Sequence, residues 1–189
     1  MAATHHPLHI PAGSATLQAD LQLPVAARGL VLFAHGSGSS RFSPRNRHVA
    51  QVLNDAGLAT VLADLLTPDE EAVDDRTRHL RFDIDLLANR LVAVTDWLGA
   101  QPLTGALKLG HFGASTGAAA AVVAASRPHV GARAVVSRGG RPDLAASELA
   151  LVDARSLLIV GGDDGEVLEM NRIALRAFKA PAQLEVVPG

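Results

Sequence analysis

The chain of 189 residues contains no cysteine. It can therefore form no disulfide, no zinc site with thiolate ligands and no cysteine nucleophile. Charge of one sign is not in excess either, because 17 Lys and Arg residues stand against 19 Asp and Glu residues and leave a net charge of −2. Without a basic run, the sequence offers no electrostatic surface for nucleic acid.

Long hydrophobic runs are also missing. The apolar stretches are shorter than the roughly 20 residues that a helix needs to span a bilayer. The first residues lack the charged and apolar regions of a secretory signal. These absences predict a cytoplasmic protein with no nucleic-acid partner, no membrane partner, no cofactor and no metal ion.

The chain does contain enough apolar sequence for one layered domain. Hydrophobic residues make up 48% of it and charged residues 19%, and domains usually have about 150 residues. Short apolar runs bounded by glycine, proline and aspartate alternate with longer segments of helical period, which is typical of the α/β class. We expect a single domain over residues 1–189.

Eight apolar runs predict the strands of one sheet. They cover residues 8–11, 16–23, 29–34, 59–63, 106–112, 132–137, 156–160 and 183–187. Only a short segment with the turn residues Ala-Gly-Ser separates the first two, which predicts an antiparallel hairpin. Helix-length segments separate the others, as crossovers between parallel strands require. The sequence therefore predicts a mostly parallel sheet of about eight strands with helices on both faces.

Four segments predict helices, and the clearest covers residues 81–98. There the apolar side chains fall on one stripe at spacings of three and four, at Ile84, Leu87, Leu91, Val94 and Leu98. The other predicted helices cover residues 47–56, 116–127 and 167–177.

The last predicted strand ends at Val187, and no segment follows that could cover its outer face. We therefore expect the domain to be C-terminally incomplete, with its final covering helix missing. An apolar sheet face left open in this way predicts homo-oligomers that form through it.

One motif points to chemistry. Residues 113–117, Gly-Ala-Ser-Thr-Gly, fit the pattern G-x-S-x-G and lie between a predicted strand and a predicted helix. In a nucleophile elbow the serine occupies a strained strand-to-helix turn, which needs tiny residues two positions before and after it. The pattern predicts Ser115 as a nucleophile, with the N–H of Thr116 at the helix start directed at an oxyanion. The alternative is a chance match in a chain rich in small residues.

A second motif follows the third predicted strand, at His35-Gly-Ser-Gly. An acyl-transfer enzyme needs a second oxyanion donor in this place, and the N–H of Ser37 is our candidate. The same glycines allow a dinucleotide site, with Asp64 as the acid that contacts a ribose. The third glycine of that fingerprint is replaced by Arg41, whose side chain would obstruct packing between strand and helix. A nucleotide-binding module is therefore the less favoured interpretation.

A third motif, Gly-Gly-Asp-Asp, ends the strand predicted at residues 156–160. An acid in this position can orient a histidine and stabilise the imidazolium that forms during catalysis. We favour Asp164 because it lies further into the loop. Aspartate also commonly caps a following helix, so the choice between Asp163 and Asp164 stays open.

Together these segments resemble the α/β-hydrolase superfamily, in its dienelactone-hydrolase-like branch. The resemblance is to bacterial members that carry serine where dienelactone hydrolase carries cysteine, some of them fused to a phosphoribosyltransferase domain. It implies Ser115 as nucleophile, Asp164 as acid and the backbone amides of Ser37 and Thr116 as oxyanion hole. The segments that carry it are His35-Gly-Ser-Gly-Ser-Ser-Arg-Phe-Ser-Pro-Arg-Asn46, Phe112-Gly-Ala-Ser-Thr-Gly117, Ser137-Arg-Gly-Gly-Arg-Pro-Asp143 and Ile159-Val-Gly-Gly-Asp-Asp164.

The family's catalytic histidine follows the last strand, and here all eight histidines precede Asp164. We therefore expect the base to lie beyond Gly189. Topology places His129 at the edge of the sheet opposite to the predicted site. His35 is interpreted as a hydrogen bonder within the oxyanion loop, and His111 as a packed neighbour that tunes the site.

Five arginines, at positions 41, 45, 47, 138 and 141, allow two interpretations. They could form an anion pocket for a substrate that carries a carboxylate or phosphate, or ion pairs with the acidic segment 69–75. The residues that we regard as candidates for the pocket are His35, Arg41, His111 and Arg138.

The sequence thus predicts a serine hydrolase acting on a small ester, lactone or related acyl substrate through an acyl-enzyme on Ser115. A rival interpretation is a non-catalytic or truncated hydrolase-fold protein that binds a small ligand or a partner. The sequence does not identify the substrate.

Overall fold

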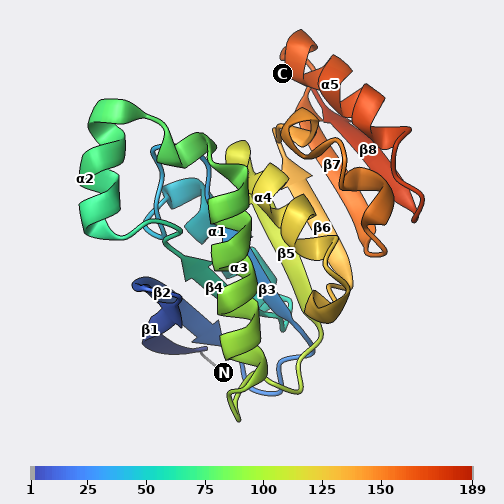
Figure 1. The fold of residues 1–189 in the computed structure, drawn as a ribbon. Coiled ribbons are helices and arrows are strands. Elements are labelled where there is room, and N and C mark those ends of the chain that lie inside the picture. The colour runs from blue at the N-terminus through green and yellow to red at the C-terminus, as the bar shows by residue number, and fades with distance from the viewer. Residues whose placement is uncertain (1–2, 189) are drawn as a thin grey trace.

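One eight-stranded sheet runs through the protein, as the computed structural model, which describes residues 3–188, shows in Figure 1. Its strand order is β1-β2-β4-β3-β5-β6-β7-β8. The strands are β1 (Thr4–Ala12), β2 (Ala15–Leu23), β3 (Leu30–Ala34), β4 (Ala59–Ala63), β5 (Leu109–Ala114), β6 (Ala134–Arg138), β7 (Arg155–Gly161) and β8 (Ala182–Val187). β2 pairs antiparallel with β1 and β4, and all other neighbours are parallel. The predicted sheet with an N-terminal hairpin is confirmed.

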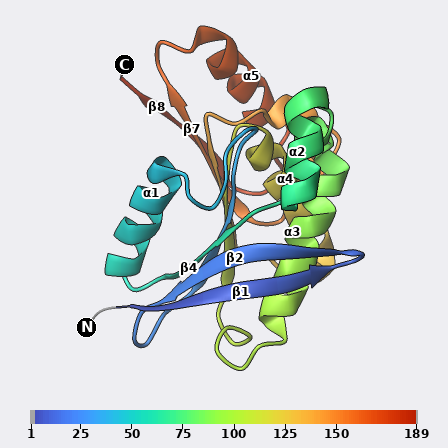
Figure 2. The ribbon, with the colours of Figure 1, turned by 90° about the vertical axis from the view of Figure 1, so that its left-hand side faces the viewer.

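Helices lie on both sides of this sheet. They are α1 (Pro44–Asp55), α2 (Pro68–Thr77), α3 (Ile84–Gly99), α4 (Thr116–Ala125) and α5 (Gly165–Leu175), with short 3-10 turns at Leu80–Phe82, Pro128–Val130, Pro142–Ala145 and Leu149–Leu151. Figure 2 shows α1 on one side of the sheet, and α3 and α4 on the other. α5 packs against β7 and β8. Among residues 3–188, no helix is both long and apolar enough to cross a membrane.

The larger core fills the space between the sheet and the helices α3 and α4. It contains the predicted stripe of α3, of which Leu87, Leu91, Val94 and Leu98 are buried. α4 is buried along its whole length because glycine, alanine and valine allow its backbone to approach the sheet closely. A smaller cluster lies on the α1 side, where the rings of Phe33 and Phe112 are 4.9 Å apart between centroids.

One helix and two helix boundaries differ from the sequence prediction, and each is explained by a cap. α2 was not predicted, although a reciprocal cap between Thr67 and Glu70 begins it. α3 begins at Ile84 and not at residue 81, because the carboxylate of Asp83 accepts the backbone N–H of Leu86 at 2.9 Å. α1 begins three residues before the predicted start, after the cap residue Ser43.

The sheet face on the α1 side is open over β6, β7 and β8. In the part of the chain that the structure describes, α1 is the only helix on this side, and it packs on β4. Val136, Leu157 and Ile159 are half-buried there, and Val187 is 46% exposed. The expected uncovered face is present, while oligomer formation through it stays a prediction.

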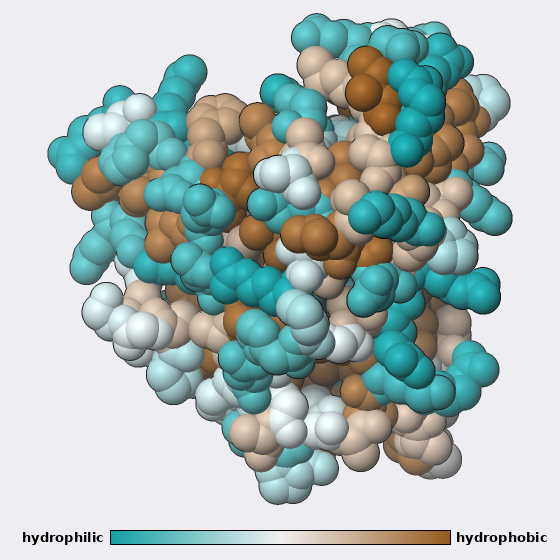
Figure 3. Space-filling model, turned by 45° about the vertical axis from the view of Figure 1, so that its right-hand side comes forward, coloured by the Kyte–Doolittle hydropathy of each residue, from teal (hydrophilic) through white to brown (hydrophobic). Residues whose placement is uncertain are grey.

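On the opposite side of the molecule, exposed hydrophobic side chains do not form one continuous surface. Figure 3 shows hydrophobic surface divided among several patches by hydrophilic side chains. No single large apolar interface stands out on this view.

Candidate active site

The turn between β5 and α4 holds Ser115 in a strained conformation. Its φ is 51° and its ψ is −124°. Residues other than glycine rarely adopt a positive φ. Such strain costs on the order of 1–3 kcal/mol and persists only where the surroundings enforce it. Ser115 is half-buried between neighbours that are buried, and its hydroxyl does not cap α4. The predicted strand-to-helix turn is therefore present, with the serine at its apex.

Two glycines make this turn sterically feasible. A Cβ at Gly113 would overlap the backbone of Ala118 in α4. A Cβ at Gly117 would overlap the carbonyl oxygens of Ala34 and His35 at the end of β3. The glycines of the motif are thus required because the strand, the helix and the loop after β3 meet without room for a side chain.

The loop after β3 is joined directly to the turn. A Cβ at Gly36 would lie 3.0 Å from Cβ of Ser115, and the hydroxyls of Ser37 and Thr116 are 3.0 Å apart. Within the described residues, the backbone N–H groups of Ser37 and Thr116 donate no hydrogen bond. Two unused amides that flank a serine are the donors that an oxyanion hole requires.

His35 connects this loop to the segment after β4. Its Nε2 accepts the backbone N–H of Leu65 at 3.1 Å, so the proton must sit on Nδ1, which donates to the carbonyl of Gly36 at 3.0 Å. Burial lowers the pKa of His35 and outweighs the hydrogen bond and the charge of Asp64, which raise it. Both ring nitrogens are occupied, so His35 holds the loop and has no lone pair free for the proton of Ser115.

His111 is a packed neighbour of the turn, as interpreted from the sequence, but it does not line the pocket for which it was also a candidate. It is 1% exposed and lies on β5, with Nε2 3.5 Å from Oγ1 of Thr95 in α3 and Nδ1 3.4 Å from the carbonyl of Ala121 in α4. Burial lowers its pKa to about 4. The alternation of side chains along β5 directs this imidazole into the core between α3 and α4.

The polar groups of Arg41 are bound by residues other than Ser115. Its guanidinium and its backbone N–H both bind the carboxylate of Asp64, and Nη2 donates to Oε1 of Gln18 at 2.8 Å. Asp20 adds a further ion pair at 3.5 Å. The sequence could not indicate these contacts, which come from β2 and from the end of β4. They also engage Asp64, the acid that the nucleotide-binding interpretation would need for a ribose.

The remaining arginines divide into paired and unpaired groups. Arg47 lies 4.0 Å from Asp20, and Arg141 pairs with Asp143 at 2.7 Å. Among the described residues, the guanidinium of Arg138, at the end of β6, donates only to Oδ1 of Asn46, at 3.4 Å. The predicted ion pairs with segment 69–75 are made by other arginines, because Arg81 binds Asp74 and Asp75 while Arg90 binds Glu70.

The two aspartates of the third motif lie in the exposed loop after β7. Asp164 caps α5 by accepting the backbone N–H of Val167 at 3.4 Å. Asp163 makes no hydrogen bond within the described residues. The N–H of Gly162 donates to the carbonyl of Val187 at 2.8 Å, so this loop lies beside the end of β8.

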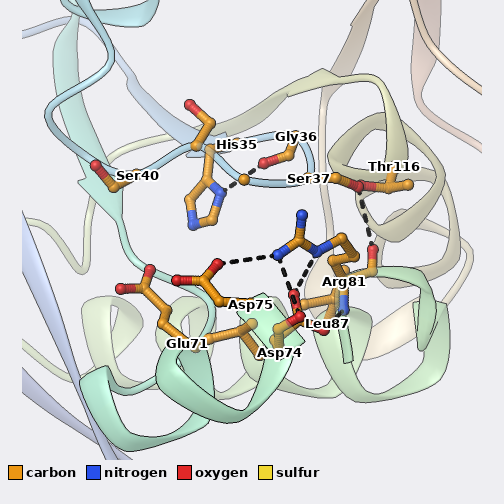
Figure 4. A pocket seen from close by; sticks show the side chains of 13 residues that line it. His35, Gly36, Ser37, Ser40, Glu71, Asp74, Asp75, Arg81, Leu87 and Thr116 are labelled. Carbon is orange, nitrogen blue, oxygen red and sulfur yellow. Dashed lines mark hydrogen bonds and ion pairs between the residues drawn. The ribbon is translucent and has the colours of Figure 1, made fainter. Parts of the chain in front are cut away.

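A cavity of about 260 Å³ opens between the loop after β3 and α2. Figure 4 shows Ser37 and Thr116 on one side, and Arg81 in the middle with Asp74 and Asp75 beyond it. Burial opposes ionisation of Asp74, but hydrogen bonds from Arg81 outweigh it and lower the pKa of the carboxyl. The sequence analysis did not predict that α2 and Arg81 form one wall of this cavity. The cap pattern at Thr67 was the one signal that could have revealed α2.

The wall of the cavity formed by α2 also includes Glu71, a carboxyl group with a raised pKa. Burial raises the pKa of Glu71, and the negative charges of Asp64 and Asp75 raise it further. Across residues 3–188, no three His, Asp or Glu side chains are grouped as ligands for a metal ion. No described histidine hydrogen-bonds to Ser115, Asp163 or Asp164 either.

Among solved structures, the chain is similar to a dienelactone hydrolase from Anabaena variabilis. The two are 56% identical, with a TM-score of 0.96, over 100% of this chain and 87% of that one. Est1E from Butyrivibrio proteoclasticus has a TM-score of 0.80 at 16% identity, over 100% of this chain and 89% of its own. A dienelactone hydrolase-like promiscuous phosphotriesterase from metagenomic libraries has a TM-score of 0.79 at 19% identity. This match covers 100% of the present chain and 83% of the phosphotriesterase. The last two share the fold.

Among curated proteins, the chain is similar to one from two strains of Mycobacterium tuberculosis, which carries the provisional name phosphoribosyl transferase. Identity is 57% over 182 residues, or 96% of this chain. The chain spans 40% of the length of these relatives. No protein-family model matches the chain.

Proposed function

Because the chain belongs to the dienelactone hydrolase-like branch of the α/β-hydrolase superfamily, we propose that it is a serine hydrolase of a small ester, lactone or related acyl substrate. The observation that carries this proposal is the strained backbone of Ser115 beside two unused amides. A strain of this kind is typical of functional sites. The esterase and hydrolase neighbours support the same general chemistry.

In the proposed mechanism, Oγ of Ser115 attacks the acyl carbonyl while its proton passes to a base. The N–H groups of Ser37 and Thr116 stabilise the oxyanion, and loss of one such donor typically costs about 10² to 10³ in kcat. The leaving alcohol takes the proton from the base and departs, which leaves an ester on Ser115. Water then attacks this ester, and the acid product leaves with the serine regenerated.

The base in this proposal is a histidine beyond Gly189, oriented by Asp164. The acid loop supports this because Gly162 is hydrogen-bonded to the end of β8, so residues after β8 emerge beside it. A serine needs such a base more than a cysteine does, because its hydroxyl is a weak nucleophile at neutral pH. The variants Asp164→Asn and Asp163→Asn separate the two candidate acids, and we expect the larger loss of kcat for the first.

The experiment that tests the function compares the natural-length protein with Ser115→Ala. We expect hydrolysis of 4-nitrophenyl acetate to fall by about 10³-fold or more, as for loss of a triad member, and labelling by a fluorophosphonate to disappear. Ser147→Ala is the matched control, because Ser147 is exposed and bonded to Glu148. Equal rates for Ser115→Ala and the parent protein would contradict the enzyme proposal.

A second candidate is a hydrolase-fold protein that binds a small ligand or partner without turnover. The observation that favours it is the absence, within residues 3–188, of a histidine bonded to Ser115 or to the acid loop. This candidate predicts no fluorophosphonate labelling of the parent protein, so the same experiment separates the two.

We further propose that the natural protein joins this domain to a phosphoribosyl transferase domain. The support is the provisional name of the curated relatives and the 40% of their length that the chain spans. The intact mass of protein purified from its natural source tests this, because a fused domain requires a mass well above 19.6 kDa.

A further inference from the structure

Arg138 is a partly buried cation without an acidic partner. Its Nε is buried and donates to nothing in the described residues, and Nη2 reaches only the neutral amide of Asn46, at 3.4 Å. Burial lowers the pKa of this guanidinium, and the positive charge of Arg45 lowers it further. Within residues 3–188, neither Arg138 nor Arg45 forms an ion pair.

This arrangement is electrostatically unfavourable by itself. Two positive charges near each other raise the free energy of the folded state, and the partial burial of Arg138 adds a desolvation cost that an acidic partner would normally offset. Arg41 and Arg141, which are also half-buried, do have such partners, because Arg41 binds Asp64 and Arg141 binds Asp143. Arg138, half-buried and without an acidic partner, together with the exposed Arg45 is therefore a site that an anion would stabilise.

The position of the pair relates it to the nucleophile. Arg138 ends β6 and lies in register with Ala114, the residue before Ser115. The backbone N–H of Arg141, on the loop that follows Arg138, donates to the carbonyl of Ser115 at 3.3 Å. Arg45 lines a surface hollow together with Gly38 and Ser39 of the loop after β3. Arg138 thus lies at the strand end next to Ser115, and Arg45 lies at the start of α1, beside the loop after β3 whose other residues line the cavity of Figure 4.

We propose that Arg138 and Arg45 form a subsite for a doubly charged phosphoryl group, so that the substrate is an ester that also carries a phosphate. This proposal rests on the function proposed for Ser115. The charge of the pair favours a dianion, because a carboxylate would neutralise only one of the two guanidinium groups. Guanidinium groups also match the oxygens of a phosphoryl group in geometry, with several N–H donors in a fixed plane.

Binding is tested without catalysis, in natural-length Ser115→Ala protein. We expect phenyl phosphate to raise the thermal unfolding midpoint saturably, and Arg138→Gln in the same background to weaken this binding about 10- to 100-fold, the range for hydrogen bonds lost to a charged group. Arg133→Gln is the matched control, because it removes the same charge just before β6, at the opposite edge of the sheet. A phosphate effect that is equal in all three proteins would overturn the subsite.

The charge of the ligand is tested by pH. The second ionisation of a phosphate monoester has a pKa of about 6, so the affinity for phenyl phosphate should rise between pH 5 and pH 7. Phenyl sulfate, which carries one charge throughout this range, should bind more weakly and without that rise. Equal affinities for the two ligands at pH 7 would overturn the choice of a dianion.

Turnover is tested with matched esters, 4-acetoxyphenyl phosphate, 4-acetoxybenzoate and the neutral 4-acetoxyphenol. We expect the parent protein to prefer the phosphate, and the ratio of its kcat/KM to that of the neutral ester to fall about 10-fold or more in Arg138→Gln. Arg138→Lys should restore part of the ratio, since it keeps the charge but loses the planar fork. Preference for the benzoate would overturn the proposal in favour of a carboxylate subsite.

These outcomes keep the subsite separate from the proposed function. If no ester is hydrolysed but phenyl phosphate still binds through Arg138, the hydrolase proposal fails and the anion subsite stands. If the neutral ester is hydrolysed through Ser115 but phenyl phosphate does not bind, the subsite fails alone. A far-ultraviolet circular dichroism spectrum of Arg138→Gln equal to that of the parent protein would show that the substitution leaves the fold intact.

Discussion

At the scale of single residues, the imidazole of His111 links stability to pH. Its pKa of about 4 in the folded protein lies below the ordinary value of 6.5, because burial disfavours the charged form. Between these values the unfolded chain binds the proton and the folded chain does not. The stabilising effect of the neutral ring is therefore fully present above pH 6.5 and is lost as the pH falls toward 4.

We expect the free energy of unfolding to decrease by up to about 3 kcal/mol from this group between pH 6.5 and pH 4, at 1.36 kcal/mol per pKa unit. His111→Gln should flatten this acid limb in urea unfolding measured at successive pH values. His129→Gln is the control, because His129 is exposed. Identical acid limbs in the parent and the His111→Gln protein would contradict the assignment, although His35, whose pKa is also lowered, adds to the limb in both.

The sequence could predict the role of a residue where neighbours in the sequence determine it, and not where distant residues do. The turn at Ser115 was predictable because the motif that marks it lies within five residues, Gly113 to Gly117. The contacts of Arg41 were not, because its partners Gln18 and Asp64 are each 23 residues away. The role of His111 depended on which face of β5 it occupies, and that face is fixed by the packing of α3 and α4.

At the scale of elements, one ion pair joins α2 to α3. The carboxylate of Glu70 accepts two hydrogen bonds from the buried guanidinium of Arg90 in α3, each at 2.6 Å, and Arg90 also donates to the carbonyl of Leu65 at 3.1 Å. Because α2 buries only Asp74, apolar packing contributes little to its position. The wall of the cavity beside Ser37 thus depends on electrostatic contacts.

Glu70→Gln should loosen this wall. The substitution leaves the buried charge of Arg90 without a carboxylate, which we expect to lower the free energy of unfolding by about 2–3 kcal/mol, and hydrogen exchange of the amides in residues 67–78 should accelerate. Asp69→Asn is the control, since Asp69 lies in the same first turn and is exposed without an ion pair. Unchanged exchange in residues 67–78 of the Glu70→Gln protein would show that α2 is held by other contacts.

The sequence predicted elements well where hydrophobic periodicity marks them. All eight strands and the buried stripe of α3 follow that signal. α2 lacks this signal, because half of its residues are acidic and Asp74 is the one residue that it buries. The cap at Thr67 was the only local sign of a helix there, and a cap pattern without an apolar stripe is weak evidence.

At the scale of the whole molecule, the parallel arrangement of β3 to β7 explains how distant segments come to one site. The loops after these strands emerge at the same edge of the sheet, which brings Ser37, Ser115, Arg138 and Asp164 to that edge from four separate parts of the sequence. The order of the strands was not readable from the sequence, but their parallel direction was, and the direction alone is enough to gather these residues.

The open sheet face over β6, β7 and β8 is the last feature at this scale. Leu157 and Ile159 are half-buried on it, and Val187 is 46% exposed. A polypeptide of residues 1–189 studied alone should therefore self-associate, because contact between two such faces removes apolar surface from water. Sedimentation velocity over a range of concentrations measures this association.

The double substitution Leu157→Lys with Ile159→Lys should reduce this self-association. Both lysines can extend into solvent if the face is open, so the unfolding midpoint should change little. Gln183→Lys is the control, because Gln183 is in register with Leu157 on the same face and adds charge at a position that is already polar. If the double variant instead unfolds in the absence of denaturant, the face is covered in the folded polypeptide, and the explanation of its self-association must lie elsewhere.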